Sequence, residues 1–144
     1  MTSANQCELT RAYVQYDAAV TPPIVYSGVS EESIVYTEPF DIVLELEAGW
    51  AIWSSGAKYN LYVVLNDLSD SSTTLWTTNT NGSLDSADPS WLNPAFKSVF
   101  QVPAGTITAA QADHVLQAIG VMSVGVGNPI VDLKQSELFI ITQP

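Results

Sequence analysis

Alternation of apolar and polar side chains is the strongest signal in this sequence, and it has the period of a β-strand. In "FDIVLELE", residues 40–47, the even positions are all apolar and the odd positions include three acids. This pattern predicts a half-buried antiparallel strand with its odd positions in solvent. The next run, "YNLYVVLND" at 59–67, is largely apolar at both parities, which is typical of a central strand. Between them, "AGWAIWSSGAK" at 48–58 is expected to extend the first strand and to turn near Gly56.

Similar short runs recur along the chain, separated by turn-forming residues. Further strands are predicted at 8–16, 73–80, 96–102, 115–124 and 137–142. One short helical turn is predicted near 108–113, because Thr108 and Gln111 have the spacing of a capping box. About seven to nine short strands with at most this one turn predict an all-β, antiparallel two-sheet β-sandwich.

A short turn before the penultimate strand is also found in immunoglobulin-like and fibronectin-like domains, which this layout resembles. The resemblance is one of layout, and it implies the sandwich architecture alone. The Cys and Trp pattern of a true immunoglobulin domain is absent. A jelly roll is the alternative architecture.

A pseudo-repeat near the start of the chain predicts a separate feature. "IVYS" at 24–27 recurs as "IVYT" at 34–37, and prolines at 22, 23 and 39 bracket the pair. Because proline is confined to sheet edges, we expect a hairpin or an extended arm within 17–39 that adds strands to a neighbouring molecule. The residues expected to make that contact are Ile24, Val25, Tyr26, Ile34, Val35 and Tyr36.

Composition favours a protein partner. The 144 residues are enough for a single domain, 1–144, that buries about 70% of its unfolded surface. Only 13% of the residues are charged, against about 25% in an average soluble domain. A chain this apolar is expected to cover part of its surface with another molecule or with a copy of itself. The net charge of -11 argues against nucleic acid and anionic membranes as partners.

Hydropathy, the first residues and the cysteine content bear on where the protein is located in or outside the cell. No run approaches the roughly 18 apolar residues of a membrane span, and "MTSANQCELT" lacks the features of a signal peptide. We therefore expect a soluble protein without a signal peptide, which is either synthesised in the cytoplasm or part of a virion, or else a mature extracellular fragment. Cys7 is the single cysteine, so no internal disulfide forms, and its thiol is expected to be buried and inert.

The stretch "TTNTNGSLDSAD", residues 77–88, is similar to a calcium-binding loop. Its candidate ligands are Asn79, Asn81, Asp85 and Asp88. The run before it has a strand pattern, whereas an EF-hand requires a helix. Two interpretations therefore stand: a weak calcium site, which is the one cofactor that the sequence suggests, and a polar turn built on Asn81-Gly82. The turn is the favoured one.

Catalytic chemistry has little support in the sequence. Glu45 and Glu47 lie about 7 Å apart on one strand face, near the separation used for glycoside hydrolysis, but solvated strands carry the same pattern. His114 is the only histidine and there is no G-x-S-x-G motif, so we expect His114 to be structural. No catalytic residue is assigned and a non-enzymatic protein is expected, with a hydrolase that uses paired carboxylates left open.

Tryptophans near the polar stretch suggest a different ligand. Trp76 and Trp91 flank it, and Asn93 follows, so these side chains are candidates for stacking on a sugar and bonding its hydroxyls. Trp50 and Trp53 differ in parity and could not both face one ligand on a regular strand.

The function expected from these patterns is that of an interaction or structural module. It would be a subunit of a larger assembly such as a virion coat, a decoration layer or an appendage, or a homo-oligomer. The alternative is a carbohydrate-binding module or lectin that uses Trp76 and Trp91, with calcium at 77–88.

Overall fold

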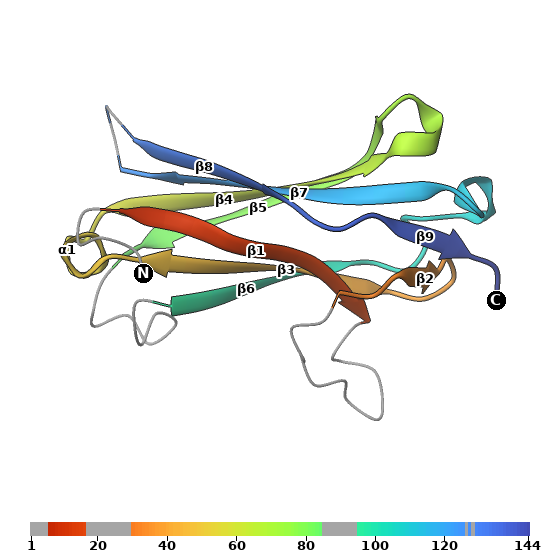
Figure 1. Ribbon diagram of the computed structural model, residues 1–144, viewed down its shortest axis with the longest axis horizontal. Helices are drawn as coiled ribbons and strands as arrows, with labels where there is room; N and C mark the ends of the chain where they lie inside the picture. Colours follow the sequence, from red (N-terminus) through yellow and green to blue (C-terminus); the bar gives the residue numbers. More distant parts are fainter. Residues whose placement is uncertain (1–5, 17–29, 85–94, 126, 128) are drawn as a thin grey trace.

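Two β-sheets packed face to face make up the protein (Figure 1). The computed structural model describes residues 6–16, 30–84, 95–125, 127 and 129–144. The smaller sheet contains β1 (Cys7–Tyr16), β3 (Phe40–Ala48) and β6 (Ala95–Val102), in that order. The larger sheet has the order β2 (Ser33–Val35), β9 (Phe139–Thr142), β7 (Val115–Val124), β4 (Lys58–Asp67) and β5 (Thr73–Ser83), and β8 (Ile130–Gln135) also pairs with β7. The all-β, two-sheet sandwich predicted from the sequence is confirmed.

Three short helical turns connect the described strands. The turn expected near 108–113 is present as η3 (Ala109–Gln111), where the Thr108 N–H donates to Gln111 Oε1 at 2.9 Å and completes a capping box. The turns α1 (Trp50–Trp53) and η1 (Leu68–Asp70) were not predicted. At α1 the expected extension of the preceding strand is wrong, because the Trp53 N–H donates to the Gly49 carbonyl at 2.9 Å and coils the chain. No described helix is long and apolar enough to span a membrane.

Strand pairing is antiparallel except between β2 and β9, which run parallel, with Ile34 opposite Ile141. Ile34 is fully buried, and Tyr36 packs against the core. The prediction that Ile34, Val35 and Tyr36 belong to an arm that adds strands to a neighbouring molecule is therefore wrong, because Ile34 and Val35 pair with β9 and Tyr36 packs against the core of the same chain. Ile24, Val25 and Tyr26 lie outside the described residues.

The core forms where the inner faces of the two sheets meet. Even positions of β3 and odd positions of β4 point inward, and they are buried together with alternate residues of β7. The two sheets make a close contact where Leu44 of β3 packs on Gly120 of β7. A Cβ added at Gly120 would lie 2.5 Å from Leu44 Cδ2, so glycine is what permits this contact.

The side chains on the outward side of β3 are less exposed to solvent than the sequence pattern predicts. Asp41 and Val43 were expected in solvent, yet both are buried. Val43 lies between Tyr13 of β1 and Val99 of β6 in the ladder, because β3 is the central strand of its sheet. Only Glu45 and Glu47 on this side remain partly exposed.

We predict that Gly120→Ala destabilises the fold by about 1–3 kcal/mol, the usual range for overpacking a core. Leu44 is fully buried and cannot swing into solvent to make room for the new methyl group. Urea unfolding measures the effect, with Ser123→Ala on the outward side of the same strand as the control. An unchanged midpoint for Gly120→Ala would show that the sheets do not meet closely at this position.

Candidate functional site

The outward face of the larger sheet carries an apolar patch in the middle of its strands. The cross-strand register places Tyr62 beside Val121, and Val121 beside Leu133. Val64 pairs with Ile119 in the adjacent row, and Val131 extends the patch along β8. We define the outer patch as Tyr62, Val64, Ile119, Val121, Val131 and Leu133.

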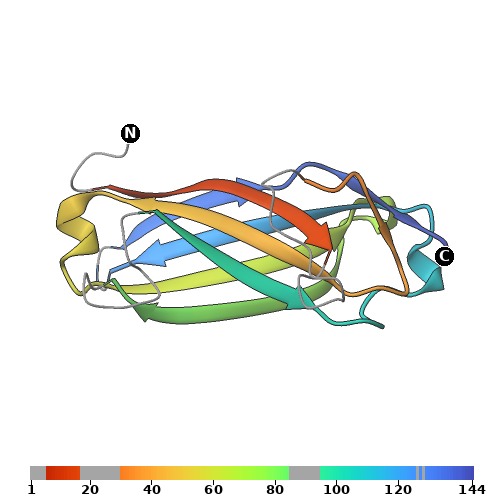
Figure 2. The same ribbon diagram turned by 90° about the horizontal axis from the view of Figure 1, so that it is seen from below.

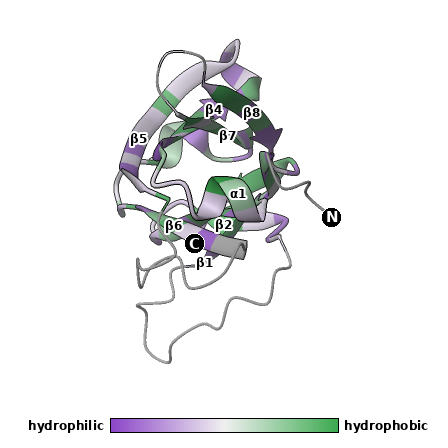
Figure 3. Ribbon diagram, turned by 90° about the vertical axis from the view of Figure 1, so that its left-hand side faces the viewer, coloured by the Kyte–Doolittle hydropathy of each residue, from purple (hydrophilic) through white to green (hydrophobic). Residues whose placement is uncertain are grey.

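Several members of the outer patch are well exposed. The exposed fractions are 63% for Val131, 54% for Leu133 and 43% for Tyr62. Hydropathy colouring shows green ribbon over β4, β7 and β8, next to the pale and lilac ribbon of β5 (Figure 3). An exposed cluster of large apolar side chains on a sheet face is characteristic of an interaction surface.

Uncharged polar side chains surround the outer patch. They are Asn60, Asn66, Thr77, Asn79, Asn81, Gln117, Ser123 and Gln135. Lys58, at one end of β4, is the only charged side chain on this face among the described strand residues. In a chain of net charge -11, the described strand residues thus place no carboxylate on this face.

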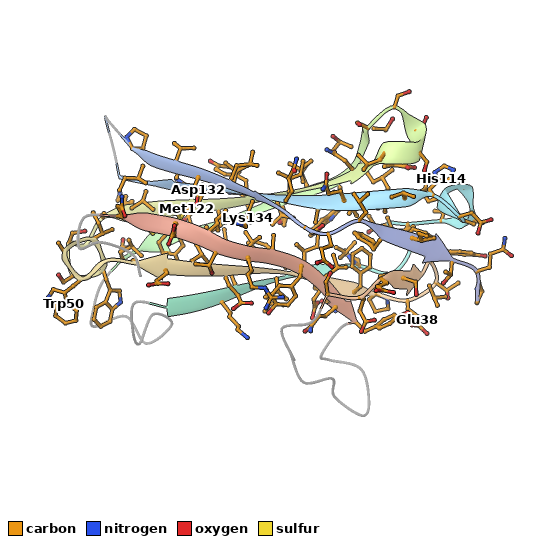
Figure 4. The ribbon with its side chains drawn as sticks, viewed as in Figure 1. Glu38, Trp50, His114, Met122, Asp132 and Lys134 are labelled. Atoms are coloured by element: carbon orange, nitrogen blue, oxygen red, sulfur yellow. The ribbon has the colours of Figure 1, made fainter. Side chains whose placement is uncertain are left out.

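The edges of the sandwich differ in how they are protected. At a bulge in β1, the Leu9 N–H donates to Asp132 Oδ2 of β8 at 2.9 Å, which ties the two sheets together at that edge. Figure 4 labels Asp132 on β8 beside Met122 of β7. On the other side, β5 pairs only with β4 in the described part of the chain.

The stretch expected to be a calcium loop or a turn is mostly strand. β5 continues through Ser83, with Asn79 opposite Tyr62 and Asn81 opposite Asn60. The Asn81-Gly82 turn is wrong because the Tyr59 ring packs on Gly82, where an added Cβ would lie 2.7 Å from the Tyr59 hydroxyl. Asp85 and Asp88 lie outside the described residues. Asn79 and Asn81 lie on extended backbone, and the weak calcium site that was the alternative stays a prediction, since its other two candidate ligands are not described.

The predicted sugar platform does not assemble as expected. Trp76 lies opposite the buried Leu65, so its ring is on the inner side of the sheet and packs on the core. Trp91 and Asn93 lie outside the described residues. Trp50 and Trp53, which a regular strand would have separated, stack edge-to-face at 4.9 Å because they lie on one helical turn. Trp50 is 64% exposed at one end of the sandwich (Figure 4).

The carboxylates proposed for hydrolysis lie on the smaller sheet. Glu45 forms an ion pair with Arg11 at 3.3 Å, and the Arg11 guanidinium stacks over the Tyr13 ring at 4.5 Å. A pocket of about 400 Å³ lies nearby, lined by Arg11, Ala12, Tyr13, Ser30, Glu32, Lys134, Gln135 and Glu137. Neither Glu45 nor Glu47 lines it, so the pair is not set in this pocket.

His114 has a structural contact that the sequence did not predict. Its Nδ1 lies 2.6 Å from Oδ2 of Asp67, a carboxylate with no exposed surface. Asp67 Oδ1 also accepts the Ser69 N–H, and Ser69 Oγ accepts the Val115 N–H. This network fastens η1 to the start of β7, which agrees with the structural role expected for His114. Within the described chain, no three His, Cys, Asp or Glu side chains gather to hold a metal ion.

Cys7 is buried, as the sequence predicted, with its Sγ 3.5 Å from Sδ of Met122. Desolvation by burial, reinforced by the Asp132 carboxylate, raises the pKa of the Cys7 thiol to about 11. Burial likewise raises the pKa of the Tyr13 hydroxyl to about 12. A protonated, enclosed thiol is a poor nucleophile and a poor metal ligand.

Comparison with known proteins supports the fold and nothing narrower. No protein-family model and no curated protein matches the chain. A glycosyl hydrolase family 2 member from Bacteroides cellulosilyticus DSM 14838 is similar in structure, with a TM-score of 0.53 and 10% identity. The match covers 94% of this chain and 15% of that one. Red sea bream transglutaminase matches with a TM-score of 0.48 and 11% identity, over 94% of this chain and 17% of that one. The chain is thus a β-sandwich protein that spans less than a fifth of either neighbour.

The outer patch was only partly visible in the sequence. Two signals were available in the sequence. Ile119 and Val121 are apolar at odd positions of 115–124, and Tyr62 lies on the second face of its strand. Val131 and Leu133 were missed because β8, "IVDLKQ", contains an acid, a lysine and a glutamine and was not recognised as a strand.

We predict that His114→Ala lowers the free energy of unfolding by about 1–3 kcal/mol, because it leaves the buried Asp67 carboxylate without one of its hydrogen bonds. His114→Asn, which keeps an amide donor, is the matched control and should lose less. Chemical denaturation measures both variants. Equal stability of His114→Ala and the unsubstituted protein would contradict the anchoring role.

We predict that stability falls as the pH rises from about 9 towards 11. The unfolded chain releases the Cys7 proton above its ordinary pKa of 9.0, whereas the folded chain keeps it until about pH 11. The unfolded state therefore binds fewer protons in this window, and the free energy of unfolding decreases with pH. Thermal unfolding of the unsubstituted protein and of Cys7→Ala over this range tests the effect. If the stability of Cys7→Ala fell equally steeply over this pH range, the pH dependence would come from a group other than Cys7.

Proposed function

We propose that this protein is a non-enzymatic assembly module that associates with further copies of itself through the outward face of its larger sheet. The observation that carries the proposal is the outer patch, which combines exposed apolar side chains with a neutral surround. Covering such side chains removes apolar surface from water and stabilises an association by roughly 25 cal/mol per Å² before the costs of binding.

Charge favours a second copy as the occupant of this face. Two chains of net charge -11 repel one another wherever their carboxylates meet. The outer patch lets them approach without placing like charges in contact, since its surround is made of amides and hydroxyls. Sheet faces also pack on one another at about 10 Å with interdigitating side chains, and a two-fold axis would place the same apolar face of both copies in contact.

A carbohydrate-binding function is the second candidate, and Trp50 is the observation that favours it. Its exposed indole, supported edge-on by the buried Trp53, provides an apolar surface at one end of the sandwich. Aromatic rings of this kind stack on sugar faces. A change in tryptophan fluorescence with a glycan panel, abolished in Trp50→Ala, would support this function, and an unresponsive protein would remove it.

We predict that Val131→Glu weakens self-association by about tenfold or more, because it places a carboxylate in place of the most exposed apolar side chain of the outer patch. Val99→Glu is the matched control, since Val99 is a comparably placed valine on the outward side of the smaller sheet, 43% exposed. Sedimentation velocity over a concentration series gives the association constant of each protein. Equal association of the two variants would exclude the outer patch as the contact surface.

A further inference from the structure

Among the described strands, β5 has one edge whose backbone hydrogen-bonding groups pair with no other strand. From Thr73 to Ser83 the strand contains no charged residue and no proline. Natural edge strands are usually protected by lysine, proline, bulges or a covering segment, because an unpaired strand is a template for another strand. In Figure 2, β5 (green) runs along the rim of the sandwich.

Hydrogen bonding at the end of the strand determines which backbone groups face outward. The Leu84 N–H donates to the Ala57 carbonyl at 2.7 Å, and the Gly125 N–H donates to the Lys58 carbonyl at 2.8 Å. Antiparallel strands direct successive residues alternately to their two neighbours, so odd residues of β4 bond to even residues of β5. The backbone N–H and C=O groups that point to the open edge are those of Thr77, Asn79, Asn81 and Ser83.

These outward-directed groups have no described partner within the chain, since β5 is the last strand of its sheet. Their side chains are short hydroxyls and amides on the same face as the outer patch. The β1 edge contrasts with this arrangement, because Asp132 of β8 already accepts its Leu9 N–H. Within the described part of the chain, the β5 edge is thus unpaired and has no charged side chain.

We propose that β5 pairs antiparallel with β5 of a second copy about a two-fold axis through Thr80. In this register Asn79 faces Asn81 of the second copy and Thr77 faces Ser83, so that all four outward-directed residues enter hydrogen-bonded pairs. No carboxylate of either strand enters the contact, so two acidic chains pair there without direct repulsion.

Pairing of this kind extends the larger sheet across the two-fold axis. The two outer patches then lie side by side on one continuous sheet and present a wider apolar surface than one chain does. This inference rests on the proposed self-association and adds the position and symmetry of one contact to it. An edge contact and a face contact together allow assemblies larger than a dimer.

A disulfide test follows from the symmetry of the proposed pair. Thr80 would face Thr80 of the second copy in a non-hydrogen-bonded pair, where Cα atoms are about 4.5 Å apart and a disulfide fits. In a Cys7→Ala background, Thr80→Cys should form a covalent dimer on mild oxidation. Thr78→Cys is the matched control, because it lies on the same face of the same strand but would face Gly82 of the second copy. We expect it to cross-link about tenfold more slowly or less.

A backbone variant provides the second measurement. Asn79→Pro removes an N–H that points to the β5 edge and breaks no bond to β4, so the monomer should keep the urea unfolding midpoint of the unsubstituted protein. Its association constant should fall about tenfold or more. Thr78→Pro removes an internal bond and serves as the destabilised comparison.

The outcomes separate the two proposals. Rapid cross-linking of Thr80→Cys alone, with weakened association of Asn79→Pro, supports the β5 pair. If the unsubstituted protein self-associates while Thr80→Cys and Thr78→Cys cross-link equally or not at all, the edge pairing is overturned and the association through the outer patch stands. A protein that stays monomeric at every concentration overturns both.

Discussion

The packing of the two sheets across one apolar core is the interaction on which the rest of the structure depends. Leu44 of the smaller sheet reaches Gly120 of the larger one so closely that no side chain fits between them. A sheet has two faces, and this contact covers only one face of the larger sheet. The apolar residues on its other face are left at the surface, which is where the proposed function originates.

The distribution of charge explains why this surface, and not another, is proposed as the contact between copies. The chain has fifteen acidic residues and four basic ones, yet Lys58 is the single ionic group among the described strand residues on the face that carries the outer patch. Acids elsewhere keep copies apart in most orientations, whereas the neutral face and the neutral β5 edge leave two ways to approach. Two copies of the chain thus repel one another in most orientations, whereas contact through the outer patch or the β5 edge brings no carboxylates together.

Local pattern predicted the fold well where strands are long. The runs that became β1, β3, β4 and β7 were located within a residue or two, since each is a stretch of nine or ten residues bounded by turn-forming or polar residues. Features that depend on distant partners were missed. The parallel pairing of Ile34 with Ile141 joins segments more than a hundred residues apart, and no local pattern reports it.

The candidate site was harder to predict for similar reasons. Asn81-Gly82 has the composition of a turn, but the Tyr59 ring from the neighbouring strand packs on this glycine and the chain stays extended. Trp50 and Trp53 meet only because residues 50–53 coil into a helical turn. Val131 and Leu133 became part of the outer patch through their pairing with β7, which the mixed composition of β8 concealed.

Light scattering of the unsubstituted chain over a dilution series tests the central claim most directly. The account predicts a mass that rises above that of a single chain as the concentration increases and that returns to it on dilution. A constant mass of one chain up to the highest soluble concentration would contradict it.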